Sequence, residues 1–173
     1  MTIFFKKHNL EFYNTLLTLS RNIFFYKINK LPDTFETRIY LMFFHFCILL
    51  IIFRKKGEKF DQKQYDKFFN KIEYNLRELG FGDVSVNSKM KDFNKILYDI
   101  LLKIELKNRD NPRAFSLNYN LILKYFNTLS DKKESNYDQF EAYFIKFYNF
   151  CFDHTCKNML KELKNFNNSY GCT

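Results

Sequence analysis

The strongest constraint on the fold is an uninterrupted run of fifteen uncharged residues, 39–53, in the first third of the chain. Arg38 comes directly before the run, and residues 54–56 are all basic. A helix that crosses a bilayer needs about 20 such residues, so the run is short by more than one turn. His45, at its middle, would add a further cost in lipid. We therefore predict a central helix that other helices bury on all sides, rather than a transmembrane span.

Residues that interrupt helices are rare along the whole chain. The 173 residues include four Gly and two Pro, whereas a β-sandwich or barrel needs a tight turn about every 8–12 residues. A chain of this length forms one domain by the usual relation between length and domain number. The sequence thus predicts an all-α fold: a single-domain helical bundle of about six helices around the buried apolar helix, spanning residues 1–173.

Apolar residues recur every three or four positions, the spacing of one helix face, in six segments. The expected helices cover residues 3–26, 32–57, 61–79, 85–110, 115–129 and 137–163, and the last ten residues are expected to fray. Between the third and fourth helices we expect a tight structural turn made by Gly80, Gly82 and Asp83, with Ser85 as the N-cap of the fourth helix. Gly80 is expected to end the third helix, because only Gly adopts a left-handed backbone without steric cost.

The chain is basic, with a net charge of +9. Residues 1–60 contribute most of it, with ten Lys and Arg against four Asp and Glu. Such a surface suits an anionic partner such as phospholipid or RNA. The use of A/T-rich codons, which favours Lys, Asn, Ile and Phe, is an alternative source of this charge. Residues 1–10 lack an apolar segment followed by small residues, so no signal peptide is expected.

No motif in the sequence points to catalysis. A P-loop, a dinucleotide-binding glycine fingerprint, a nucleophile elbow and a zinc-protease motif are all absent. The four cysteines have unrelated spacings, so we expect reduced, mostly buried thiols in a cytoplasmic protein: Cys47, Cys151, Cys156 and Cys172. The residues therefore predict a protein that is not an enzyme and that has no cofactor or metal site.

Two segments carry a specific pattern. In the first, Tyr13, Arg21 and an aromatic pair at 25–26 precede Leu-Pro-Asp-Thr at 31–34, and Arg38 follows. The second, residues 76–86, reads Leu-Arg-Glu-Leu-Gly-Phe-Gly-Asp-Val-Ser-Val. Both resemble the ubiquinol–cytochrome c chaperone family of α-proteobacteria, which has Val-Pro-Asp-Thr and Leu-Arg-Glu-Met-Gly-Val-Gly-Asp-Leu-Ser-Val in these places. The resemblance covers roughly residues 12–105, and the helices expected over residues 114–164 match only in helical character.

The resemblance implies a non-enzymatic chaperone for assembly of the cytochrome bc1 complex (ubiquinol–cytochrome c reductase, respiratory complex III). Its expected partners are newly made cytochrome b and other bc1 subunits, with the ribosome and the inner-membrane surface as further candidates and no DNA. The expected location is cytoplasmic, peripheral to the inner membrane. Charged residues in or beside the matching segments are the candidate contacts with the client: Arg38, Arg77, Lys89 and Lys91. The family-motif residues Pro32, Asp33 and His45 are expected to be buried.

Two other functions fit the same residues. The chain could be a basic helical module that binds RNA or the ribosome, or a peripheral protein that binds anionic membranes through residues 3–26. The 28 basic residues are dispersed and mostly Lys, and no recognition-helix pattern is visible, which argues against nucleic acid.

Overall fold

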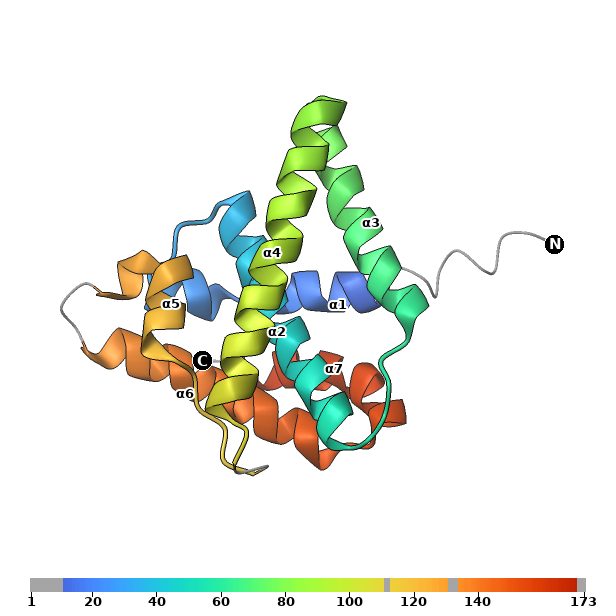
Figure 1. Cartoon of the computed structure of the whole chain (residues 1–173). Coiled ribbons are helices and arrows are strands. Elements are labelled where there is room, and N and C mark those ends of the chain that lie inside the picture. The colour runs from blue at the N-terminus through green and yellow to red at the C-terminus, as the bar shows by residue number, and fades with distance from the viewer. Residues whose placement is uncertain (1–10, 111–112, 131–133, 171–173) are drawn as a thin grey trace.

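The computed structural model describes residues 11–110, 113–130 and 134–170, which form seven α-helices and no β-strand (Figure 1). α1 (Glu11–Ser20) is followed by a π-helical turn, η1 (Phe24–Ile28), and by the long α2 (Phe35–Lys55). α3 (Gln62–Glu78) and α4 (Asp83–Lys107) form a helical hairpin. α5 (Tyr119–Tyr125) leads through the 3-10 turn η2 (Asn127–Ser130) to α6 (Glu134–Asp153) and α7 (Cys156–Tyr170). The predicted all-α class is confirmed.

α2 is the central helix of the bundle and contacts α1, α4 and α6. Every residue in 39–53 is buried except Tyr40 and Leu50, which are half-buried. A helix that is apolar on all sides must be covered on all sides, because exposed apolar area of this size would be costly in water. The prediction of a buried apolar helix at the centre of the fold is confirmed.

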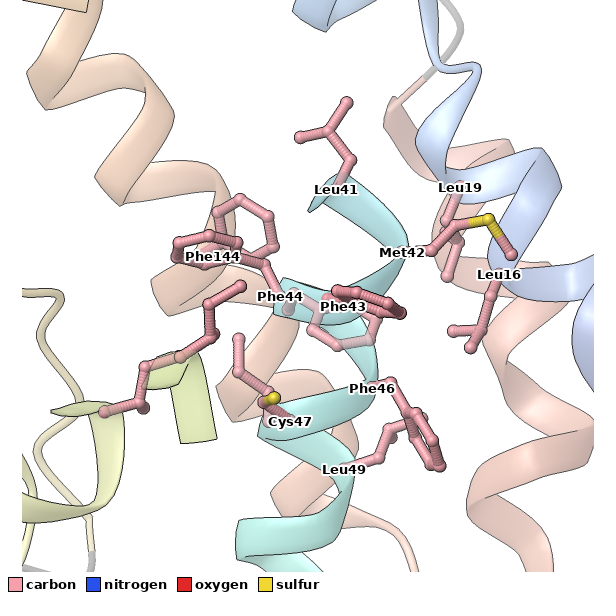
Figure 2. Close-up of a cluster of buried hydrophobic side chains, with 14 of the residues drawn as sticks. Leu16, Leu19, Leu41, Met42, Phe43, Phe44, Phe46, Cys47, Leu49 and Phe144 are labelled. Atoms are coloured by element: carbon pink, nitrogen blue, oxygen red, sulfur yellow. The ribbon is translucent and has the colours of Figure 1, made fainter. Parts of the chain in front are cut away.

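Figure 2 shows how the side chains of α2 point outward in several directions into the core. Met42 faces Leu16 and Leu19 of α1, whereas Phe44 lies beside Phe144 of α6. Side chains from all seven α-helices join one hydrophobic core. The helices around α2 therefore share a single packing unit.

α2 is also the one helix in the described part of the chain that is long and apolar enough to cross a membrane. The other helices bury 72% of its most apolar 18-residue window. A buried core helix in a folded bundle can have the same length and composition as a membrane-spanning helix. The extensive burial of α2 is typical of a core helix.

Aromatic rings account for much of the contact between helices. The ring centroids of Phe46 in α2 and Phe68 in α3 are 4.9 Å apart in an edge-to-face arrangement. Phe44 and Phe144 join α2 to α6 with centroids 5.8 Å apart. Such pairs contribute about 0.5–1.5 kcal/mol each beyond the area they bury. Many of the aromatic residues in the described part of the chain thus have a structural role.

The prediction of one continuous first helix over residues 3–26 is wrong for residues 11–26, which the structure describes. α1 ends at Ser20, and a hydrogen bond from the Phe24 N–H to the Asn22 side-chain oxygen (3.0 Å) helps to start the separate turn η1. The Tyr26 hydroxyl donates to the Ser20 carbonyl oxygen at 2.6 Å. Ile23, an apolar residue inside the range of the expected helix, is exposed. Residues 3–10 lie outside the described residues.

The expected single helix over residues 137–163 is also wrong, because the chain forms α6 and α7 with a break at residues 154–155. The ammonium group of Lys56 donates to the carbonyl oxygens of Phe152, at 2.6 Å, and of His154. Both carbonyls lie at the end of α6, where no helical partner is available. The segment expected to fray is helical to Tyr170. The fifth expected helix, 115–129, is shortened to α5 and η2.

Candidate partner-binding site

The α3–α4 hairpin extends beyond the rest of the bundle, at the top of Figure 1. Its turn starts at Gly80, whose φ of 91° is the left-handed conformation expected from the sequence. The Gly80 N–H donates to the Arg77 carbonyl oxygen at 3.0 Å, and the Phe81 N–H donates to that of Leu76 at 3.3 Å. These bonds satisfy carbonyl groups that the end of α3 would otherwise leave unpaired. The hairpin turn is therefore fixed by a glycine-dependent helix stop.

Gly82 has a different role in the same turn. It is the N-cap of α4, with φ −73° and ψ 164°, a conformation open to any residue, and it provides no side-chain cap. Asp83 is the first residue of α4, where its negative charge interacts favourably with the positive end of the helix dipole. The expected N-cap role of Ser85 is wrong, because α4 begins two residues before it.

Three large apolar side chains lie exposed at the end of the hairpin: Leu79, Phe81 and Val84, which we call the hairpin tip. Their exposed fractions are 58%, 38% and 85%. Single exposed apolar residues are common, but three within six residues at the end of an extended hairpin form a local apolar surface. Such surfaces on soluble proteins mark sites of contact with proteins or membranes.

Charged groups adjoin the hairpin tip. Arg77 of α3 pairs with Glu73, at 2.9 Å, and with Asp83 of α4, so it ties the two helices together across the turn. The Lys89 ammonium lies 4.8 Å from the centre of the Phe81 ring and 3.9 Å from a Glu36 carboxylate oxygen of α2. Lys91, two residues after Lys89 in α4, is exposed. Three of the four candidate contacts, Arg77, Lys89 and Lys91, thus lie on or near the same end of the hairpin.

The fourth candidate, Arg38, lies in a cavity of about 370 Å³ between α1, α2 and α3. Residues of both sequence segments line it, including Tyr13, Arg21 and Arg38 from the first and Leu79 from the second. The Asn75 amide donates to the Tyr13 hydroxyl at 2.6 Å across the cavity wall. Leu79 belongs to both the cavity and the hairpin tip. The fold therefore brings the two segments of the sequence pattern to one continuous surface.

Two of the family-motif residues are not where we expected them. Pro32 and Asp33 are exposed, so the prediction that they are buried is wrong. Asp33 accepts two hydrogen bonds from the Arg38 guanidinium, at 2.8 and 2.6 Å. The Asp33 carboxylate is therefore paired with Arg38 at the protein surface. Thr34 then caps α2, with its Oγ1 accepting from the Thr37 N–H at 3.2 Å. This segment sets the start of α2.

His45 lies in the core, three residues beyond the cavity-lining Met42 on α2, and is fully buried. Its Nδ1 is 2.6 Å from the Leu41 carbonyl oxygen and its Nε2 is 2.9 Å from the Tyr143 hydroxyl. Burial lowers the pKa of His45 to about 4. Both ring nitrogens of the neutral imidazole are thus satisfied within the core, which is a structural arrangement.

The thiols and carboxylates form no cluster with the geometry of a metal site in the described residues. Cys47, Cys151 and Cys156 are free and buried, and burial raises the pKa of each of these thiols. Cys172 lies outside the described residues. The features gathered at the hairpin tip and its cavity, an apolar surface with cations beside it, are those of a binding surface.

Comparison with known proteins bears directly on this surface. A model of the ubiquinol-cytochrome c chaperone family matches residues 28–135, which include α2, the whole α3–α4 hairpin and α5. The chain belongs to the ubiquinol-cytochrome c chaperone family. No curated protein and no solved structure matches it. Membership indicates a chaperone role in assembly of the bc1 complex, and a role of that kind is non-enzymatic.

Sequence reasoning missed the hairpin tip as a surface. The expected third helix ended at Leu79, and no surface role was expected for Leu79, Phe81 or Val84. A signal was present, because Phe81 lies between two glycines and Val84 lies off the three-four spacing that continues with Val86 and Met90. Apolar residues at such positions have no helix face to bury them.

Proposed function

We propose that this chaperone binds newly made cytochrome b at the cytoplasmic face of the inner membrane, through the hairpin tip and the cavity beside it. Family membership supports the bc1 complex as the assembly concerned. The observation that carries the proposal is the exposure of three apolar side chains at the far end of the hairpin.

The chemistry of the surface fits an apolar client. A membrane protein that has not yet met its partners exposes apolar segments that need temporary cover. Leu79, Phe81 and Val84 offer apolar and aromatic area of the kind found at the centres of protein interfaces. The cavity next to Leu79 can take an apolar side chain of the client against Met42 and Ile39.

The cations around the tip support the membrane-side location. Lys89 lies beside Phe81 of the tip, and Lys91 is two residues further along α4. Basic residues near the cytoplasmic leaflet gain about 1 kcal/mol each from anionic lipids. An apolar contact flanked by cations suits a client that is held close to such a leaflet.

Site-specific crosslinking in the native host tests this proposal. A photoreactive residue in place of Val84, the most exposed side chain of the tip, should crosslink to cytochrome b. The matched control is the same probe at Leu106, which is also exposed but lies at the opposite end of α4, about 35 Å away. Crosslinks from Val84 to ribosomal proteins alone, or equal capture of cytochrome b from both positions, would contradict the proposal.

A further inference from the structure

A second cavity, of about 460 Å³, lies between α1, α3 and α7, beside the start of α3. Four lysines line it, two from the first two turns of α3 and two from the first two turns of α7: Lys63, Lys67, Lys157 and Lys161. Helices far apart in the sequence thus bring four cations to one hollow.

Most of this positive charge is not neutralised inside the protein. Lys63, Lys157 and Lys161 make no ion pair within the described chain. Two carboxylates also line the cavity and offset part of this charge. Glu11 pairs with Lys164, and Asp61 caps α3 by accepting from the Lys63 N–H at 3.1 Å. The start of α7 adds the positive end of one helix dipole, whereas the Asp61 carboxylate already occupies the start of α3. The cavity is therefore an electropositive site that favours an anion.

Apolar side chains form part of the cavity wall. Phe12, Phe68 and Leu160 supply apolar surface beside the lysines.

We propose that this cavity binds the headgroup of an anionic phospholipid. The phosphate would lie among Lys63, Lys157 and Lys161. The apolar part next to the headgroup would contact Phe12 and Leu160. A free phosphate would use the lysines but leave the apolar wall unused. This site does not depend on the proposed function, because α1 and α7 lie outside the segment that the family model matches.

Two triple variants with the same change in net charge test the proposal. The pocket variant is Lys63→Gln with Lys157→Gln and Lys161→Gln. The control is Lys27→Gln with Lys95→Gln and Lys107→Gln, three exposed lysines on other parts of the surface. Binding of the full-length proteins is measured by flotation with vesicles of phosphatidylcholine alone and of phosphatidylcholine mixed with phosphatidylglycerol. Circular dichroism and the Tm confirm that both variants fold.

The wild-type protein and the control should bind the phosphatidylglycerol vesicles, and the pocket variant should bind roughly tenfold more weakly than the control. None should bind phosphatidylcholine alone. Equal losses in the two variants would mean that diffuse charge drives binding, which overturns the site. A Tm measurement with inorganic phosphate distinguishes a soluble phosphate ligand from a lipid headgroup. If phosphate raises the Tm of the wild type but not of the pocket variant, while both bind vesicles equally, the ligand is a soluble phosphate and the lipid assignment is wrong.

Discussion

His45, in the middle of α2, accepts a hydrogen bond from the Tyr143 hydroxyl of α6 across 2.9 Å, and both side chains are fully buried. The direction of this bond follows from the other ring nitrogen. Nδ1 faces the Leu41 carbonyl oxygen, which can only accept, so the proton of the neutral ring is on Nδ1 and Nε2 is the acceptor. The bond links the central helix to its neighbour inside a largely apolar core.

Acid should destabilise the fold through His45. Its pKa is about 4 in the folded protein against an ordinary 6.5, so between these values the unfolded chain binds a proton that the folded chain does not. Stability is therefore complete above pH 6.5 and falls as the pH approaches 4, by on the order of 3 kcal/mol from this group. Urea unfolding across this range should show a steeper loss for the wild type than for His45→Gln. Parallel pH profiles would show that His45 does not titrate in this way.

Tyr143→Phe should destabilise the protein by about 1–2 kcal/mol, because it leaves His45 Nε2 buried without a donor. Chemical denaturation measures the loss. The imidazole remains buried in this variant. Its free energy of unfolding should therefore depend on pH more strongly than that of His45→Gln. An unchanged free energy of unfolding would mean that the hydrogen bond contributes nothing net.

The same substitution should have opposite effects at the two glycines of the hairpin turn. Gly80→Ser places a side chain on a left-handed backbone and should cost about 1–2 kcal/mol. Gly82→Ser gives α4 an N-cap side chain on an extended backbone and should be neutral or stabilising. Thermal unfolding of the two variants makes the comparison. A lower Tm for Gly82→Ser than for Gly80→Ser would contradict the assignment of the turn.

The sequence predicts the helices whose ends depend on neighbouring residues, and it does not predict those whose ends depend on residues far away in the chain. α2 and the end of α3 follow from local signals, an apolar run and a glycine at the helix end. The break between α6 and α7 has no Gly or Pro to mark it. It coincides with hydrogen bonds from Lys56 to carbonyls 96 and 98 residues away, and no local pattern reports such a contact.

The site shows the same division. The turn at Gly80 and the chemistry of Arg38, Arg77, Lys89 and Lys91 are visible in the sequence. Their arrangement is not, because Leu79 meets Tyr13 and Arg38 only after α1, α2 and α3 have packed. Burial of Pro32 and Asp33 was predicted wrongly because an exposed ion pair with Arg38 satisfies the same motif.

Reversal of the charges beside the hairpin tip should lower accumulation of the bc1 complex without unfolding the chaperone. In Lys89→Glu with Lys91→Glu, loss of the contact with Glu36 costs under about 1 kcal/mol, since that pair is largely exposed. Lys95→Glu with Lys107→Glu, on the same helix, is the matched control. Native gels of host membranes give bc1 content. Equal bc1 content in the two strains would place the electrostatic contact elsewhere.

The central claim is that the hairpin tip acts on the client during bc1 assembly. Its most direct test is the haem b and assembled bc1 content of membranes from cells whose only copy carries Phe81→Ser with Val84→Ser. The comparison strain carries Leu102→Ser with Leu106→Ser, two exposed leucines elsewhere on α4. We predict that the tip variant folds, accumulates normally and lowers bc1 content to the level of a deletion strain, while the comparison strain keeps normal content. Normal bc1 content with the tip variant, at wild-type chaperone levels, would contradict the claim.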